Sequence, residues 1–346
     1  MDVTTKKLLN HLQRSFPIVS SPYRYLGDML KLGEEQVIER IRHLKRLGII
    51  RQISAIFNTG ALGYQSSLVA MAVPAERLEE AAEVINAYPG VSHNYLRPGR
   101  YNMWYTIAVP PGTSIEEVVG RLTRAAGGWP TLILPALKKY KLAVVLDILQ
   151  DTDNSEQFCN IPMTETSATF VANKQNILMV RCVQEDLPLV SAPFALWAQE
   201  LGLSEAELLG RLKQWINCGF IRRFAALLDH RRIGFKANGM IVWSCPEDQI
   251  DRLGYRLASF SEVSHCYHRA AQDDWPYNLY AMVHGRNLEQ CRNIARRLAR
   301  KIGIENYRIM VSTREFKKIR LKLFWDEPAY PAWCNLSGGR HGRETG

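Results

Sequence analysis

Two short stretches of the chain carry the same order of side chains, and these side chains are suited to proton transfer and anion binding. The stretches are VSHNYLR (91–97) and VSHCYHR (263–269). Because alternate residues of a β-strand lie on one face, the histidine, tyrosine and arginine of each stretch are predicted to lie together. An imidazole exchanges protons near neutral pH, and a guanidinium pairs with carboxylates. These residues are His93, Tyr95 and Arg97 in the first stretch and His265, Tyr267 and Arg269 in the second.

A further run of residues after each stretch adds aromatic rings. Rings hold flat ligands by stacking and by apolar contact. Rings beside imidazoles and guanidiniums therefore predict a site for a flat, aromatic molecule that carries several carboxylates. A second histidine of the later stretch, His268, is expected to point to the opposite face or to lie where the strand ends. The added residues are Tyr101, Trp104 and Tyr105 in the first copy, Tyr277 and Tyr280 in the second, and Arg100 in the first connecting turn.

The two stretches belong to a longer duplication. Residues 16–53 align without a gap to residues 187–224, at a displacement of 171 positions. The chain is therefore predicted to hold two copies of one unit of about 145 residues. Between the copies lies a polar segment rich in Ser, Thr and Asn, which is typical of a linker. The alignment pairs Pro17 with Pro188, Pro22 with Pro193 and Gly48 with Gly219.

Each unit is predicted to begin with a helix-turn-helix and to continue with a β-α-β-β-α-β domain. In the first unit Val37, Ile41 and Leu44 recur at helical spacing, and Gly48 ends that helix. The order that follows is typical of ferredoxin-like domains, whose two helices cover one face of the sheet and leave the other face for a partner or a ligand. It comprises a strand at 64–74, a helix at 75–88, strands at 90–97 and 101–109, a helix at 114–126 and a strand near 138–146.

A helix-turn-helix followed by a βαββαβ domain resembles the Lrp/AsnC family of bacterial regulators, in which two chains pair through the second domain and bind a small effector there. The fold class implied is α+β, a tandem duplication of these two domains that forms an intramolecular pseudo-dimer. The expected divisions are a helix-turn-helix domain (1–58), a ferredoxin-like domain (59–149), a linker (150–173), a second helix-turn-helix domain (174–229), a second ferredoxin-like domain (230–328) and a C-terminal tail (329–346).

The helix that would read DNA in such a regulator starts with acidic residues in both units. They are Glu34 and Glu35 in the first unit and Glu205 and Glu207 in the second. Recognition helices usually offer basic or amide side chains to bases and phosphates, whereas carboxylates repel phosphate. We therefore expect these domains to serve as packing modules, and we do not expect DNA as a partner.

At the V-S-H-x-Y-x-R strand and the following Y-N-x-[WY] segment, the sequence resembles the Lrp/AsnC-like siroheme decarboxylases in their fused, two-subunit form. The resemblance spans both units. It implies that siroheme, an iron isobacteriochlorin with eight carboxylates, is the substrate. It also implies that the acetates at C12 and C18 lose CO2, giving 12,18-didecarboxysiroheme for haem d1 or alternative haem biosynthesis. No cofactor beyond the iron tetrapyrrole substrate and no oxidant is implied.

The resemblance and the side-chain chemistry together assign roles. Each acetate becomes a methyl group, so a proton must be delivered, and an imidazole can donate it, orient the substrate or ligate the iron. The second copy has two histidines in its stretch, whereas Leu96 stands at the place of His268 in the first, so one pocket could do the chemistry while the other supports it. The histidines expected at the site are His93, His265 and His268. The expected carboxylate anchors are Arg97, Arg100 and Arg269. The expected pocket walls are Tyr101, Trp104, Tyr105, Tyr277 and Tyr280. No metal-binding residues of the protein are expected.

Composition limits the alternatives. The 346 residues carry a formal charge of +10, which favours an anionic partner. No apolar run approaches the roughly 18 residues of a membrane span, and the seven cysteines are scattered, so a cytoplasmic protein without a disulfide framework is expected. Two other functions fit the same site: a fused DNA-binding transcription regulator and a tetrapyrrole carrier without catalysis. Further assembly of pseudo-dimers into a homo-oligomer stays open.

Overall fold

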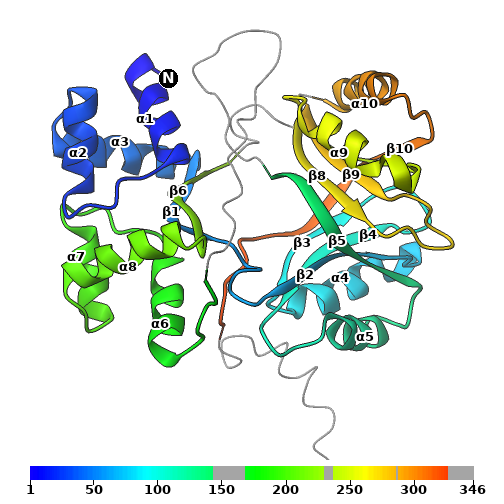
Figure 1. The fold of residues 1–346 in the computed structure, drawn as a ribbon, viewed down its shortest axis with the longest axis horizontal. Helices are drawn as coiled ribbons and strands as arrows, with labels where there is room; N and C mark the ends of the chain where they lie inside the picture. Colours follow the sequence, from blue (N-terminus) through cyan, green and yellow to red (C-terminus); the bar gives the residue numbers. More distant parts are fainter. Residues whose placement is uncertain (143–167, 230–236, 286, 326–346) are drawn as a thin grey trace, which may run out of the picture.

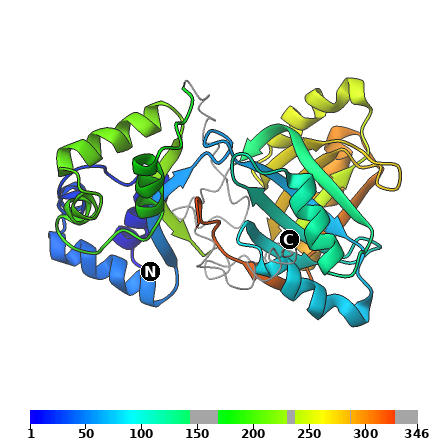
Figure 2. The same cartoon turned by 90° about the horizontal axis from the view of Figure 1, so that it is seen from below.

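The computed structural model describes residues 1–142, 168–229, 237–285 and 287–325, which form two bodies (Figure 1). One body contains the helix-turn-helix parts of both units, and the other contains a nine-stranded sheet with helices on its outer side. The view turned by 90° shows the same two bodies side by side (Figure 2). The predicted α+β fold, a duplicated helix-turn-helix and ferredoxin-like pair, is confirmed.

Each unit opens with three helices. Pro22 and Pro193 stand in the first turn of the second helix of their units, where the missing N–H would have no helical partner. Gly48 and Gly219 have φ angles of 68° and 78° after the third helix, in the left-handed region that ends many helices. The prolines and glycines that align in sequence thus bound the same helices in both units. The helices are α1 (Val3–Arg14), α2 (Pro22–Leu30) and α3 (Glu34–Arg46), then α6 (Lys174–Val183), α7 (Pro193–Glu200) and α8 (Glu205–Asn217).

A strand that the sequence pattern did not predict follows each helix-turn-helix. β1 (Ile50–Phe57) pairs with β6 (Ile221–Leu228) in an antiparallel two-stranded sheet. Through this pair the six helices share one hydrophobic core. Each strand finds its hydrogen-bonding partner only in the other unit, so local sequence does not mark it.

Each ferredoxin-like domain contributes four strands and two helices. The first contains β2 (Gln65–Met71), α4 (Leu78–Ala87), β3 (Val91–Leu96), β4 (Met103–Val109), α5 (Ile115–Ala125) and β5 (Thr131–Leu142). The second contains β7 (Ala237–Trp243), α9 (Ile250–Ala258), β8 (Val263–Arg269), β9 (Leu279–Gly285), α10 (Leu288–Ile302) and β10 (Tyr307–Val311). Short 3-10 turns, η1 (Ala75–Arg77) and η2 (Glu247–Gln249), lead into α4 and α9.

The two domains exchange strands to form one sheet. Its order is β10-β7-β9-β8-β5-β2-β4-β3-β11. The first half of β5 pairs with β2 and the second half pairs with β8 of the other unit. In the same way, β11 (Arg314–Lys318) follows β10 and pairs with β3 of the first unit. Each ferredoxin-like domain therefore receives an edge strand from its partner.

The start of β5 differs from the prediction of a strand near 138–146. Pro135 lies where β5 passes from β2 to β8. A proline donates no ladder hydrogen bond, so it suggests that a strand starts only after it. Here the proline occupies the crossover point, and the strand extends on both sides of it.

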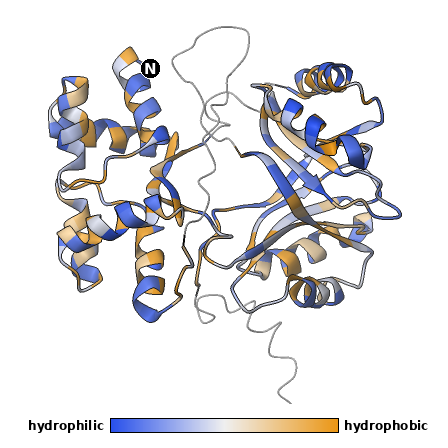
Figure 3. Cartoon of the chain, in the orientation of Figure 1, coloured by the Kyte–Doolittle hydropathy of each residue, from blue (hydrophilic) through white to orange (hydrophobic). Residues whose placement is uncertain are grey.

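The sheet face that the helices leave free is covered by the other unit, which is the partner that the predicted pseudo-dimer implies. The two half-sheets pack their inner faces against each other, with Trp104, Leu134 and Val242 in the buried cluster between them. Helices α4 and α5 cover one outer face and α9 and α10 the other. Hydrophobic and hydrophilic residues alternate along these helices, as expected where one side is buried (Figure 3). The inner faces thus bury a packed cluster of aromatic and aliphatic side chains between the units.

Several predictions concern residues outside the described part. They are the tail (329–346) and most of the linker (150–173). In the part of the chain that the structure describes, no helix is long and apolar enough to cross a bilayer.

Candidate active site

Each histidine strand contains a β-bulge at its serine. Val91 faces Ile107 and His93 faces Thr106, which leaves Ser92 as the extra residue. The second unit repeats this register around Ser264. A bulge adds one residue to a strand and turns its side chains relative to the partner strand. The serine and the histidine of each copy therefore both face the inner side of the sheet.

The predicted ladder of histidine, tyrosine and arginine is present in both units. In the first unit the ring centres of His93 and Tyr95 are 6.1 Å apart, and the Arg97 guanidinium lies 5.5 Å from the Tyr95 ring. The second ladder has matching values of 6.2 Å and 5.0 Å for His265, Tyr267 and Arg269. We call these groups the first site and the second site.

The arginine of each site reaches across to the opposite half-sheet. Arg97 Nη1 donates a hydrogen bond of 2.5 Å to the carbonyl of Met310, and Arg269 Nη1 donates to the carbonyl of Leu134. The two residues are only 4% and 8% exposed. Their Nε atoms are buried without a hydrogen-bond partner, and within the described ranges no carboxylate forms an ion pair with either guanidinium. Burial lowers the pKa of Arg97 to about 10 and lowers the pKa of Arg269 as well.

Most of the predicted wall residues gather between the half-sheets. Trp104, Tyr280 and Tyr101 are buried there, and Tyr277 is partly buried beside them. Trp104 Nε1 donates to the carbonyl of Tyr101 at 2.7 Å. The rings therefore lie on the same side of the sheet as the two ladders.

Trp275 was not predicted, and it lies in the middle of this aromatic group. Its ring centre is 5.3 Å from that of Trp104 and 4.9 Å from that of Tyr277. Its Nε1 donates to the Tyr280 hydroxyl at 2.7 Å. The loop after the second ladder is four residues longer than the loop after the first, which is the signal that could have identified it.

Two predicted site residues lie on the other face of the sheet. Tyr105 follows Trp104 directly, so strand alternation turns it into the core under α4 and α5. Burial raises the pKa of its hydroxyl, which has no hydrogen-bond partner among the described residues. His268 lies 3.7 Å from Glu247 on the α9 side. The structure does not bring either residue to the ladders.

Arg100 lies at the rim of the aromatic group. It forms an ion pair of 3.0 Å with Asp274, and 63% of its side chain is exposed. The same carboxylate accepts a hydrogen bond of 2.5 Å from the Tyr101 hydroxyl. Arg100 is therefore already paired, in contrast to the two buried arginines.

Cations from β1, β6, β5 and β11 surround the ladders and were not predicted. The charges of Lys318 and Arg51 act on His93. Arg222 lies close enough to Tyr267 and Lys139 for their charges to interact. The strands that carry these residues come from the helix-turn-helix body and from the exchanged edges, so only their assembly reveals the cluster.

The first histidine is electrostatically disfavoured as a cation. Burial, followed by the charges of Lys318 and Arg51, lowers the pKa of His93 to about 4. At neutral pH its imidazole is therefore uncharged in the protein without ligand. A bound carboxylate would raise this pKa, because an opposite charge favours the protonated ring.

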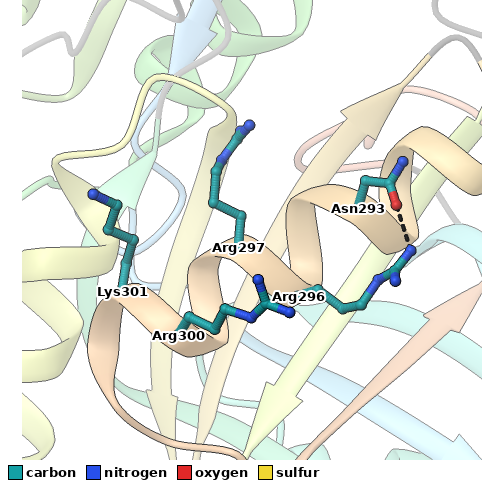
Figure 4. A pocket seen from close by; sticks show the side chains of 5 residues that line it. All are labelled: Asn293, Arg296, Arg297, Arg300 and Lys301. Carbon is teal, nitrogen blue, oxygen red and sulfur yellow. Dashed lines mark hydrogen bonds between the residues drawn. The ribbon is translucent and has the colours of Figure 1, made fainter.

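A separate hollow of about 620 Å³ lies along the outer side of α10 (Figure 4). It is lined by Asn293, Arg296, Arg297, Arg300 and Lys301. All five side chains are exposed, and none of them belongs to either ladder. This basic surface of α10 thus lies on the outer side of the sheet, whereas the cluster between the half-sheets lies on the inner side. No group of three or more metal-binding side chains is found in the described ranges.

Comparisons with known proteins agree with this architecture. Residues 61–141 and 232–317 match the AsnC-like ligand binding domain, and residues 5–51 and 177–222 match the siroheme decarboxylase NirDL-like HTH domain. A protein of Hydrogenobacter thermophilus named siroheme decarboxylase is 37% identical over 326 residues, which cover 93% of this chain and 95% of that protein.

Two solved structures share the whole fold. The crystal structure of the siroheme decarboxylase NirDL matches with a TM-score of 0.77 and 32% identity, covering 97% of this chain and 98% of that one. The same protein in co-complex with an iron-uroporphyrin III analogue matches with a TM-score of 0.76 and 33% identity, covering 97% and 99%. From the matched domains, the full-length relative and the shared fold, we conclude that this chain belongs to the siroheme decarboxylase family.

Proposed function

We propose that this protein decarboxylates siroheme at its C12 and C18 acetates and releases 12,18-didecarboxysiroheme for haem d1 or alternative haem biosynthesis. The observation that carries the proposal is the pair of buried guanidinium groups, Arg97 and Arg269. Each lies beside a histidine and a tyrosine and has no carboxylate partner among the described residues. A buried cation is costly unless an anion joins it. The carboxylates of siroheme would supply that anion.

The chemistry requires one proton for each CO2. The bond between the methylene carbon and the carboxylate carbon breaks, CO2 leaves, and a proton from the protein completes the methyl group. The macrocycle can accept the electron pair until the proton arrives, so we propose no cofactor beyond the substrate. Arginines that hold the remaining carboxylates would fix the reacting arm, which reduces the entropy cost of reaching the transition state.

We propose His265 as the proton donor of the second site. Its ring stacks on the Tyr267 face at an interplanar angle of 25°, in line with the Arg269 guanidinium. His93 is uncharged at neutral pH, so we propose that it orients the substrate in the first site. Trp104, Tyr101, Tyr277 and Tyr280 would form the walls. Arg100 would contact a carboxylate at the rim, whereas Tyr105 and His268 are not included in the proposed pocket.

The test is to incubate the purified protein with siroheme without oxygen and to follow the tetrapyrrole by mass spectrometry. Loss of two CO2 masses, with no other reagent added, would support the proposal and the absence of a further cofactor. His265→Ala should abolish or strongly slow this loss. Binding of siroheme with no loss of mass would instead indicate a carrier. Five described cysteines are free thiols, which is consistent with the cytoplasmic location that we also propose.

A further inference from the structure

We propose that His284 and Ser264 form a proton relay to His265. Through this relay the second site can deliver protons to the substrate more readily than the first site. This inference rests on the proposed decarboxylase function and goes beyond it, because it assigns a role to two residues that do not touch the substrate. His284 showed no sign of a functional role in the sequence, since its nearest ladder residue, Arg269, is fifteen positions away. Only the register of β8 and β9 brings it to the site.

The relay is a chain of three side chains on the inner face. Ser264 Oγ lies 2.9 Å from His284 Nε2 and 3.0 Å from His265 Nδ1. It also lies 3.2 Å from the Met282 carbonyl, which competes for the hydroxyl hydrogen at the longer distance. A hydroxyl can accept one hydrogen bond while donating another, and its hydrogen rotates to suit. The serine is buried, whereas both histidines are partly exposed.

The first site has the same serine contact but not the second histidine. Ser92 Oγ lies 3.0 Å from His93 Nδ1. Val91 faces Ile107 in the first unit, and Val263 faces Val283 in the second. The residues that follow these partners, Ala108 and His284, therefore occupy equivalent places. An alanine cannot pass a proton, so the chain ends at Ser92.

The exchanged strands strengthen the difference between the sites. Lys318 of β11 stands opposite His93, and Leu142 of β5 stands opposite His265 in the equivalent register. A lysine beside an imidazole opposes its protonation, whereas a leucine carries no charge. The first site thus has a cation where the second has an apolar side chain, in addition to lacking the relay.

Each decarboxylation uses three proton transfers along this chain. His265 gives its Nε2 proton to the methylene carbon as CO2 leaves, and its Nδ1 takes the hydroxyl proton of Ser264. The serine oxygen takes the Nε2 proton of a protonated His284, which becomes neutral, and His265 is left with its proton on Nδ1. A proton taken from water at His265 Nε2 then drives the same transfers backward through Ser264, so that the proton returns to His284 and His265 again carries a proton on Nε2. One proton enters from water for each CO2 released. Since His284 acts through His265, it is a positioning residue for proton delivery and not a group that contacts the substrate.

The experiment compares His284→Gln and His284→Ala with the unaltered chain in single-turnover reactions with siroheme. Glutamine can keep the hydrogen bond to Ser264 but cannot carry a proton between its atoms. We expect both variants to release CO2 about tenfold more slowly, a fraction of the effect of a full general acid. We also expect imidazole in the buffer to restore the rate of His284→Ala, and siroheme affinity to stay unchanged. His43→Gln, an exposed histidine on α3, serves as the matched control.

Two results would overturn the relay. One is an unchanged rate in both variants. The other is a slow His284→Ala whose rate is recovered by His284→Gln, because that would show a structural hydrogen bond. If the unaltered chain binds siroheme and releases no CO2, the proposed function itself fails and the relay fails with it. The reaction of the unaltered chain is therefore measured first. If it releases CO2, a negative result with the His284 variants counts against the relay alone and not against the proposed function.

Discussion

Arg97 and Arg269 are each held by one backbone carbonyl of the opposite unit, while their Nε atoms have no partner among the described residues. Charge-assisted hydrogen bonds contribute more than neutral ones, but a buried cation without an anion loses its hydration. Each arginine is therefore expected to weaken the empty protein and to strengthen the complex. Mutation should separate these two effects.

Arg97→Met is expected to weaken siroheme binding by about 10- to 100-fold, the loss of one charged hydrogen-bonded contact. Without siroheme, the unfolding temperature of this variant should stay close to that of the unaltered chain, because removing an unpaired buried charge offsets the loss of the hydrogen bond to the Met310 carbonyl. Spectroscopic titration and thermal unfolding measure the two quantities. Arg296→Met on the exposed side of α10 is the matched control, with no change in affinity. Equal affinity of Arg97→Met and the unaltered chain would contradict the assignment.

The lowered pKa of His93 should make the folded protein less stable as the pH falls. Its pKa is about 4 in the folded protein and near 6.5 in an unfolded chain, so the unfolded state binds more protons between these values. Stability from this group is fully present above pH 6.5 and is lost as the pH falls toward 4, by up to about 3 kcal/mol.

His93→Gln should therefore lose less stability than the unaltered chain between pH 7 and pH 4.5. Denaturant midpoints at the two pH values measure the difference. An identical fall in both proteins would show that other groups, not His93, cause the acid sensitivity.

The sequence allowed the ladders to be predicted because strand alternation alone places every second residue on one face. The same alternation excludes Tyr105 from the site, because its neighbour Trp104 occupies the inner face; placing both residues in the pocket was wrong. The bulges at Ser92 and Ser264 and the contact with His284 could not be predicted, because they depend on the register between two strands. Register is set by packing of the whole sheet rather than by local pattern.

At the scale of elements, α3 has little free positive charge to offer to DNA. Arg42 and Arg46 pair with Glu39, Lys45 pairs with Asp186, and Arg40 pairs with Asp2. Its first turn carries Glu34 and Glu35. Most cations of α3 are therefore already paired with carboxylates and are not free to bind phosphate.

We expect no sequence-specific DNA binding by the full chain. Fluorescence anisotropy with a library of duplexes at 50 and 200 mM salt would measure it. Weak binding that disappears at the higher salt is the expected result, since such binding comes only from phosphate contacts. A palindromic duplex bound at both salt concentrations would support the alternative regulator function.

A partly buried lysine, Lys317, anchors the exchanged strand β11. Lys317 Nζ donates to the carbonyls of Asn86 and Tyr88 at 2.6 and 3.3 Å, at the C-terminal end of α4. Burial lowers the pKa of this lysine to about 8. Lys141 of β5 makes the equivalent contact with the carbonyl of Phe260 after α9. The cation favours a helix C-terminus, where carbonyl groups lack helical partners.

Lys317→Met should therefore lower the free energy of unfolding by about 1–3 kcal/mol, because two partly buried carbonyls lose their donor. Lys322→Met, at an exposed lysine paired with Glu185, should change it by less than about 1 kcal/mol. Urea denaturation of both variants makes the comparison. Equal effects would mean that the strand is held by its ladder hydrogen bonds alone. The missed strands β1 and β6 follow the same logic, because their partners lie in the other unit.

At the scale of the whole molecule, charge is expected to govern how fast the substrate arrives. The chain carries a net charge of +10, and siroheme is a polyanion. Opposite long-range charges speed association, and salt screens them over about 8 Å at physiological ionic strength. Stopped-flow mixing should show an association rate that falls several-fold between 50 and 500 mM salt. A rate independent of salt would show that a conformational change of the protein, rather than encounter, limits binding.

The duplication was evident from aligned prolines and glycines, and it correctly predicted a pseudo-dimer within one chain. The exchange of β5 and β11 was not evident, because a strand has the same local pattern whichever sheet it joins. The covered inner face follows from that exchange. The sequence thus predicted the domains and their number. The interface between the two units depends on strand pairs that are far apart in the chain.

That interface constrains how the protein can evolve. Each site includes a strand from the unit that does not supply its histidine. A mutation in the second half can therefore alter the surroundings of His93, and a mutation in the first half can alter those of His265. Neither half could be deleted, replaced by a copy of the other or inherited alone without damaging both sites. Fusion into one gene keeps the two halves in equal number. Each half can then change its function only if the other half changes with it.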